Sequence, residues 1–134
     1  MAYFKEIAVD SRERDELIKL DDQVARAISD SGVKDGVCHV FVPHTTAGVT
    51  INEGADPGLA RDILGRLAGL VPQNAGYAHV EDNADSHIKA ALVGSSVSVL
   101  VRDGAPLLGT WQSVFFCEFD GPRRRRVFVR VAEA

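Results

Sequence analysis

The sequence lacks the features that define several large classes of protein. It has only two cysteines, Cys38 and Cys117, and no CxxC spacing, so it offers neither a cysteine-rich zinc motif nor a dithiol redox motif. No apolar run approaches the roughly 18 residues of a transmembrane helix, and the first residues do not resemble a signal peptide. We therefore expect a cytoplasmic protein with no membrane partner. Both cysteines lie in apolar, strand-like runs and are expected to be buried free thiols.

Motifs for covalent catalysis and for nucleotide hydrolysis are also missing. Gly94-Ser95-Ser96 is typical of a helix end followed by a strand, not of a nucleophile elbow, and the glycines at 104 and 109 lack the spacing of a phosphate loop. The net charge of −4 argues against a nucleic-acid partner, because general nucleic-acid binders need a basic face.

One run of positive charge stands out, Arg123–Arg126, directly after an Asp-Gly-Pro turn. In an extended strand these side chains alternate, so only two of them point the same way. One interpretation is a solvated strand end whose arginines pair with nearby acids. The other is a phosphate-binding group in which Arg123, Arg124 or Arg125 participates, because a guanidinium matches phosphate oxygens bidentately.

The order of the expected elements predicts the fold class. A chain of 134 residues is long enough for one domain, residues 1–134, with a core of its own. Strands and helices are grouped rather than alternating as βαβ units, which predicts an α+β fold with mixed or antiparallel sheets. Three helices are expected, at residues 21–31, 56–70 and 83–93, each beginning with a capping aspartate or asparagine. About seven strands are expected, at Tyr3–Val9, Asp15–Leu20, Val37–Val42, Gly48–Asn52, Val97–Val101, Thr110–Phe119 and Val127–Val131.

Apolar spacing also predicts how some of these elements pack. We expect Gly48–Asn52 to pair with Val37–Val42 and the segment 102–109 to be a link without structure of its own. The third helix should face inward through Ile88, Ala91 and Leu92. The second helix should face the core through a stripe at helical spacing, formed by Leu59, Ile63, Leu64, Leu67 and Leu70.

Three of the four histidines lie among polar residues at expected element boundaries. His44 precedes two threonines, while His79 and His87 lie on either side of an acidic and amide-rich cluster. Three imidazoles with an open fourth position suit a zinc-like ion, although they match no known spacing motif. The alternative is a set of surface histidines. His39 lies inside an apolar strand and is expected to be structural or exposed on a face outside the core.

Carboxylates and amides near these histidines extend the candidate site. Asp82 and Asp85 lie beside His87, and Glu53 follows the expected strand after His44. Each is a candidate base, a further metal ligand or a group that orients a histidine, and a harder ion such as Mg²⁺ would prefer them to imidazoles. Asn83 lies at the start of the third helix, where free backbone N–H groups can receive an anion.

Four more polar residues and one tryptophan complete the set of candidates. The hydroxyls of Thr45 and Thr46 either bind a substrate or cap a turn, and Asn52 ends a strand. Trp111 beside Gln112 either packs in a core or interface, or stacks on and hydrogen-bonds a flat heterocycle.

Three blocks of the sequence resemble one known family. Pro43–Glu53 (PHTTAGVTINE), Asp82–Gly94 (DNADSHIKAALVG) and Leu108–Val127 (LGTWQSVFFCEFDGPRRRRV) are similar to the signature blocks of the YjbQ family, also called secondary thiamine-phosphate synthase. The resemblance runs from the first expected strand to the last. It implies a compact α+β domain that assembles as a homotrimer.

The resemblance also implies a function to test. Its lead form is a weak or secondary thiamine-phosphate synthase, a transferase that joins hydroxymethylpyrimidine diphosphate to thiazole phosphate and releases diphosphate, with a divalent metal such as zinc or magnesium assisting. The same residues fit a metal-dependent hydrolase of a small metabolite, or a non-catalytic trimeric ligand-binding protein. In the trimer, the pocket would form between subunits.

Overall fold

The computed structural model describes residues 2–134 and has an α+β architecture. Within these residues there are three helices and eight strands, and all the strand pairs are antiparallel. One sheet has five strands in the order β1-β8-β3-β5-β6, and the other has three in the order β2-β7-β4. The elements are β1 (Ala2–Asp10), β2 (Glu16–Lys19), α1 (Asp21–Ser31), β3 (Asp35–Phe41), β4 (Ala47–Glu53), α2 (Pro57–Leu70), α3 (Ala84–Val93), β5 (Ser96–Arg102), β6 (Ala105–Leu107), β7 (Gln112–Glu118) and β8 (Arg124–Glu133).

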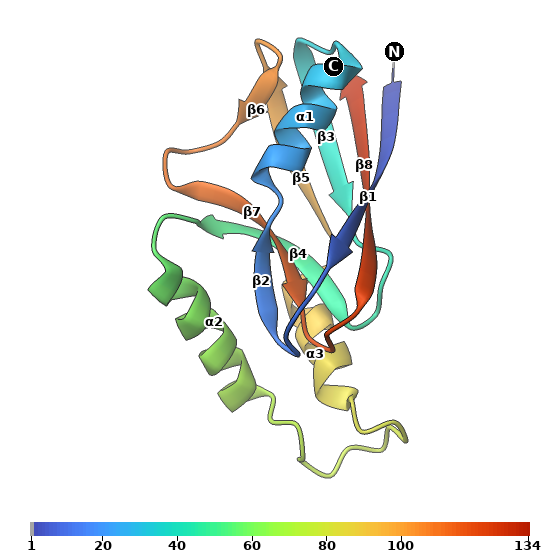
Figure 1. The fold of residues 1–134 in the computed structure, drawn as a ribbon, viewed down its shortest axis with the longest axis vertical. Helices are drawn as coiled ribbons and strands as arrows, with labels where there is room; N and C mark the ends of the chain where they lie inside the picture. Colours follow the sequence, from blue (N-terminus) through green and yellow to red (C-terminus); the bar gives the residue numbers. More distant parts are fainter. Residues whose placement is uncertain (1) are drawn as a thin grey trace.

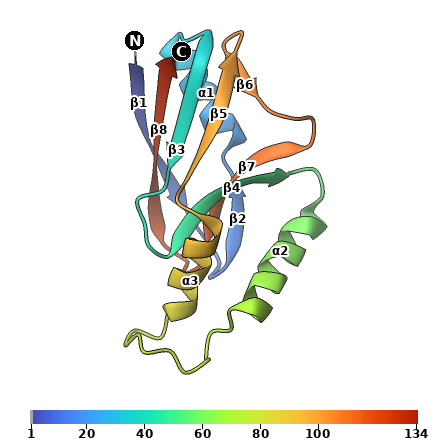
Figure 2. The same cartoon turned by 180° about the vertical axis from the view of Figure 1, so that it is seen from behind.

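The main core lies between α1 and the inner faces of the two sheets (Figures 1 and 2). Strand β8 supplies Val127, Val129 and Val131 to it, and these alternate with outward-facing residues as a half-buried strand requires. Helix α1 supplies Val24 and Ile28, one helical turn apart. The expected class is therefore confirmed, with sheets that are purely antiparallel.

Two predictions about strands were wrong. Strand β4 pairs with β7 in the smaller sheet instead of with β3, because the chain leaves β3 at Pro43 and crosses between the sheets. The segment after β5 forms an eighth strand, β6, in a tight hairpin. Its turn residues Asp103 and Gly104 both have positive φ, at 53° and 74°, as a two-residue hairpin turn requires.

The helix caps follow the sequence only in part. Asp56 caps α2 as predicted, since its carboxylate accepts a hydrogen bond from the Gly58 amide at 2.8 Å. Helix α1 does begin at Asp21, but Leu20 occupies its cap position. The Asp21 carboxylate instead accepts from the Val114 amide of β7 at 2.8 Å, which joins the helix to the smaller sheet.

The predicted inner face of α3 was wrong, and the predicted face of α2 is turned toward the rest of the fold but is buried less than expected. No residue of α2 is buried; Leu64 and Leu67 contact a small second core only partly, and Leu70 is exposed. In α3 the side chain of Leu92 is 64 % exposed, whereas Lys89 is 2 % exposed. Helix α3 lies against β4 below the sheets, and α2 is set apart on one side (Figure 1). Ion pairs, not apolar spacing, decide which face of α3 is turned inward.

Both cysteines are free and buried, as expected, and burial raises the pKa of Cys38 to about 11 and that of Cys117 to about 12. Across residues 2–134 there is no helix long and apolar enough to cross a membrane.

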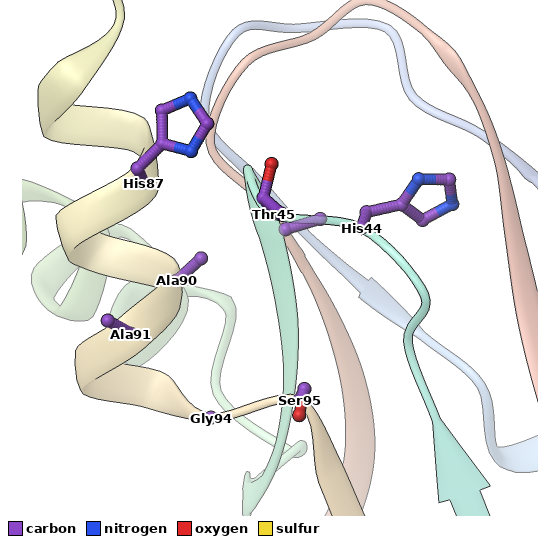
Figure 3. Close-up of a pocket in the computed structure, with 8 residues that line it drawn as sticks. His44, Thr45, His87, Ala90, Ala91, Gly94 and Ser95 are labelled. Atoms are coloured by element: carbon purple, nitrogen blue, oxygen red, sulfur yellow. The ribbon is translucent and has the colours of Figure 1, made fainter. Parts of the chain in front are cut away.

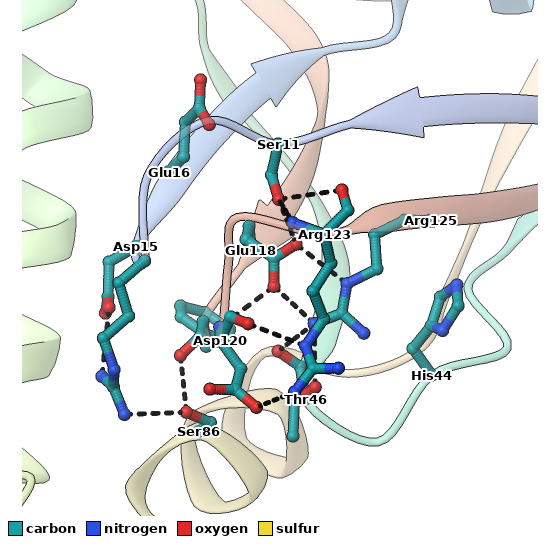
Figure 4. Close-up of polar contacts among 12 residues, drawn as sticks. Ser11, Asp15, Glu16, His44, Thr46, Ser86, Glu118, Asp120, Arg123 and Arg125 are labelled. Carbon is teal, nitrogen blue, oxygen red and sulfur yellow. Dashed lines mark hydrogen bonds and ion pairs between the residues drawn. The ribbon is translucent and has the colours of Figure 1, made fainter. Parts of the chain in front are cut away.

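A buried ion pair joins the two sheets. Glu118 at the end of β7 is fully buried and accepts from Arg125 Nε of β8 at 2.8 Å, with a second, short contact from Nη2 (Figure 4). Ser11 donates to the same carboxylate at 2.7 Å. Burial alone would raise the pKa of Glu118, but these hydrogen bonds outweigh it and hold the pKa below its ordinary value. The charged form is therefore the one that the fold stabilises.

We predict that Glu118→Gln lowers the free energy of unfolding by about 3–5 kcal/mol, because it leaves a buried guanidinium without a counter-charge. The pKa of Glu118 is lower in the folded state. Its stabilisation should therefore be complete above the unfolded pKa of about 4.3 and be lost as pH falls further. Urea denaturation between pH 7 and pH 3 measures both effects.

The matched control is Asp10→Asn, which removes an exposed partner of Arg124 at 3.6 Å and should change the free energy by less than about 1 kcal/mol. Equal losses for the two variants at pH 7 would contradict the importance given to the buried pair.

Candidate functional site

A cavity of about 360 Å³ lies between α3 and the start of β4. His44 and Thr45 line it from the connection between β3 and β4, and His87 and Ala90 line it from α3 (Figure 3). Gly48 makes this approach close, because a side chain there would begin 2.5 Å from the carbonyl oxygen of Gly94. The structure therefore brings two of the three candidate metal-binding histidines to one hollow.

His44 is held by the backbone of β8. Its Nε2 accepts a hydrogen bond from the Arg126 amide at 2.9 Å, and its ring is turned away from α3 in Figure 3. Burial, and then the positive charge of Arg125, lower the pKa of His44 below its usual value. The imidazole is therefore neutral at pH 7.

His87, which lines the cavity, forms a pair with His79 at its edge. Their ring centroids are 4.9 Å apart and the rings meet edge to face. His79 Nε2 also lies 3.9 Å from the Glu81 carboxylate, and with Asp82 it lines a second hollow of about 210 Å³. Two imidazoles that share a tetrahedral ion at about 2.0–2.1 Å have centroids roughly 5 Å apart, a separation similar to the 4.9 Å found here. Among residues 2–134, no three acidic, histidine or cysteine side chains are arranged to hold an ion.

The start of α3 is tied to the turn before β8. The Asp120 carboxylate accepts from Asn83 Nδ2 at 2.9 Å and from Arg123 Nη2 at 3.0 Å. Asn83 Oδ1 is buried and has no hydrogen-bond partner among the described residues. Arg123 is half exposed, so its guanidinium, which Asp120 holds beside the start of α3, still reaches solvent (Figure 4).

Three of the predicted site residues are engaged inside the fold. Arg125 donates to Thr46 Oγ1 at 2.8 Å as well as to Glu118. The side chains of Arg125 and Thr46 are both buried, so neither can contact a substrate. Asp85 is fully buried, where Arg14 binds it bidentately at 3.0 Å. Burial opposes ionisation of Asp85, but Arg14 and Lys89 outweigh it and hold its pKa below the ordinary value. A carboxylate in this state is a counter-ion and a poor base.

Arg124 is exposed on β8 beside Asp10, and the four other candidates lie at the opposite end of the smaller sheet. They are Asn52 and Glu53 at the end of β4, and Trp111 and Gln112 at the start of β7, where Glu53 pairs with Gln112. At the other end of these two strands, beside the cavity, Ala47 pairs with Glu118. A seven-residue strand spans about 20 Å. Trp111 is 66 % exposed, and the Glu53 carboxylate accepts from the Asp56 amide at 3.1 Å. Within one chain these residues do not join the histidines.

Sequence reasoning missed the ionic cluster beneath α3. Lys89 Nζ contacts the Asp15 carboxylate at 2.7 Å and Asp85 at 3.4 Å, and Ser86 donates to the Phe119 carbonyl. Arg14 binds both Asp85 and Ser86. The spacing of Asp85 and Lys89, four residues apart on one helix, was the available signal.

Comparison with known proteins identifies relatives of this chain. A family model described as "UPF0047 protein YjbQ-like" matches residues 5–134. A UPF0047 protein of Methanocaldococcus jannaschii is 50 % identical over 92 % of this chain and 89 % of its own. The UPF0047 protein YugU of Bacillus subtilis is 39 % identical over 95 % and 97 % of the two chains.

Solved structures show the same fold. A crystal structure of a YjbQ/UPF0047 family protein from Clostridium acetobutylicum superposes with a TM-score of 0.94 at 48 % identity, covering 96 % of this chain and 99 % of that one. A YbjQ-like protein of unknown function from Sulfolobus solfataricus gives a TM-score of 0.96 at 35 % identity, covering 100 % and 99 %. The chain described here belongs to the YjbQ (UPF0047) family.

Proposed function

We propose that this protein is an enzyme acting on small phosphorylated metabolites, with thiamine-phosphate synthase as its specific activity. The observation that carries the proposal is the cavity at α3. A neutral histidine and the Thr45 hydroxyl line it, and two histidines whose ring centroids are 4.9 Å apart, His79 and His87, lie beside each other at its edge. The family resemblance supplies the reaction, in which hydroxymethylpyrimidine diphosphate and thiazole phosphate combine and diphosphate leaves.

The residues around the cavity suit a reaction limited by the departure of an anion. As the bond to the leaving diphosphate breaks, negative charge grows on its oxygens, and fixed donors and cations that face them lower the barrier. The guanidinium of Arg123 is paired with Asp120 beside the start of α3, but it is half exposed and keeps further N–H donors for this role. Thr45, exposed at the cavity, offers a hydroxyl donor.

A divalent cation fits beside this cavity. His79 and His87 would supply two ligands, with water, substrate oxygen or a neighbouring subunit completing the sphere. When bound, such an ion supplies electrostatic stabilisation of a leaving phosphate group. His44 has a different role from this pair, because its Nε2 atom already accepts a hydrogen bond from the Arg126 amide.

We predict that His79→Ala and His87→Ala each weaken Zn²⁺ binding by more than about tenfold, because each removes one of two imidazoles that share the ion. Calorimetric titration of the purified protein and elemental analysis after dialysis measure the loss. The matched control is His39→Ala, since His39 is exposed on the outer sheet face and bonds Ser98 at 3.1 Å. If both variants retain the parent's affinity, this pair is not a metal site.

Turnover tests the proposed reaction directly. Incubation with both substrates and Zn²⁺ or Mg²⁺ should give thiamine phosphate, detected by mass spectrometry. Arg123→Ala should lower kcat/KM roughly 10- to 100-fold, because a hydrogen bond to a charged group contributes about 1.5–3 kcal/mol. The control, Arg26→Ala, removes an exposed guanidinium of α1 that does not line the cavity. If the parent makes no product with either ion, the transferase proposal is wrong.

One observation favours a second candidate, a metal-dependent hydrolase. The Asp82 side chain lines the hollow next to His79, where a carboxylate can take a proton from an attacking water. The same turnover mixtures distinguish it, because a hydrolase would release phosphate or diphosphate from one substrate in the absence of the other. A protein that retains the ion and performs neither reaction would be a ligand-binding protein.

We also propose that the chain assembles as a homotrimer, as the family resemblance implies. Two exposed apolar surfaces support this. One lies on the outer face of the larger sheet and includes Phe4 and Leu100; the other lies on the outward face of α3 and includes Ile88 and Leu92. Two different surfaces suit a head-to-tail cyclic assembly. Such an assembly could also bring Trp111 to a neighbour's cavity.

We predict that light scattering at micromolar concentration gives about three times the 14.4 kDa of one chain. Leu92→Asp should shift the mass toward the monomer, because it places a charge on an apolar surface without disturbing a buried residue of the same chain. The control is Arg26→Asp, an exposed residue of α1 outside both apolar surfaces. A parent mass of one chain would overturn the assembly.

A further inference from the structure

His44 combines two features that the proposed function leaves unexplained. Its Nε2 is occupied by the Arg126 amide, and its Nδ1 has no hydrogen-bond partner among residues 2–134. An amide N–H can donate only to an unprotonated nitrogen, so the neutral ring must carry its proton on Nδ1. The fold thus determines the tautomer of this histidine.

The β8 backbone explains why this contact exists. Strand β3 pairs with β8 as far as Phe41 and Phe128, and beyond that point the chain turns away through Val42, whose amide bonds the Ser95 carbonyl. The Arg126 amide, two residues nearer the start of β8 than Phe128, therefore lacks a partner from β3. His44 Nε2 takes the place of the missing carbonyl.

The connection that carries His44 is fixed at a second point. Two residues later, the Thr46 hydroxyl accepts from Arg125, which is itself held by Glu118. Because neighbouring residues of β8 point to opposite sides, Arg125 holds the connection by its side chain and Arg126 holds it by its backbone. The imidazole is therefore preorganised at the cavity wall.

We propose that His44 is a fixed Nδ1–H donor that binds a phosphate oxygen of the substrate and is not a ligand of the metal. This inference rests on the proposed function only for the phosphate; the tautomer follows from the fold. An imidazole held neutral offers one donor and no competing charge, and its donor position does not depend on reorganisation during binding. The ion is left to the His79–His87 pair.

Two substitutions separate the roles of the two ring nitrogens. The amide of His44→Gln reaches about as far as Nε2, so it can accept from Arg126 but lacks the Nδ1 donor. The amide of His44→Asn lies near the Nδ1 position, so it keeps a donor but cannot reach Arg126. Each variant is compared with the parent in diphosphate titration, Zn²⁺ titration and thermal unfolding.

We expect His44→Gln to keep its Tm within about 2 °C of the parent and to weaken inorganic diphosphate binding roughly 10- to 100-fold. His44→Asn should bind diphosphate close to the parent and lose about 4–8 °C in Tm, because the Arg126 amide is left unpaired. Zn²⁺ affinity should be unchanged in both. The reverse pattern, or unchanged diphosphate binding in both variants, would sink the proposal, as would a loss of Zn²⁺ equal to that of His87→Ala.

Two-bond ¹H–¹⁵N correlation spectra of the parent at pH 7.5 test the tautomer without any ligand. The His44 signals, identified by their absence in the variants, should show the Nδ1–H pattern; an Nε2–H pattern overturns the inference. None of these measurements needs turnover. A protein that passes them all and makes no thiamine phosphate would leave the role of His44 intact and remove the transferase proposal alone.

Discussion

The Glu118–Arg125 pair is the contact on which the other features of the site depend. It joins the end of β7 to the start of β8, and through Ser11 and Thr46 it also fixes the chain after β1 and the chain before β4. Removing two charges from water costs several kcal/mol, and only the full set of hydrogen bonds around the pair offsets this cost. The pair determines where the β3–β4 connection lies, and hence where His44 and Thr45 meet α3.

The polar residues of the family blocks divide into three groups with different physical tasks. Asp85, Thr46 and Arg125 are held by partners inside the fold and shape the cavity. His44, Thr45 and Arg123 keep donors that face solvent. Asn52 and Trp111 lie about 20 Å away along β4 and β7, a distance set by the length of the strands.

Sequence patterns predicted the elements better than their partners. Alternating and helical apolar spacing located all three helices and seven of the eight strands. The pairing of β4 with β7 depends on a crossing between sheets that local spacing does not encode. The separation of Trp111 from His44 has the same cause. The three-residue strand β6 was not predicted, although Asp103-Gly104 is a hairpin signal.

Helix α3 has its polarity reversed relative to an ordinary surface helix. Its charged residues Asp85 and Lys89 are buried against Arg14 and Asp15, while Ile88 and Leu92 face outward. Within a single chain, the apolar positions of this helix therefore tolerate substitution better than its charged positions do. A polar replacement at Leu92 leaves the fold of one chain intact, whereas a leucine at Lys89 would leave Asp85 and Asp15 short of a cation. As sequences in this family diverge, drift at the buried positions of this helix must therefore occur in compensating pairs, with acid and base changing together.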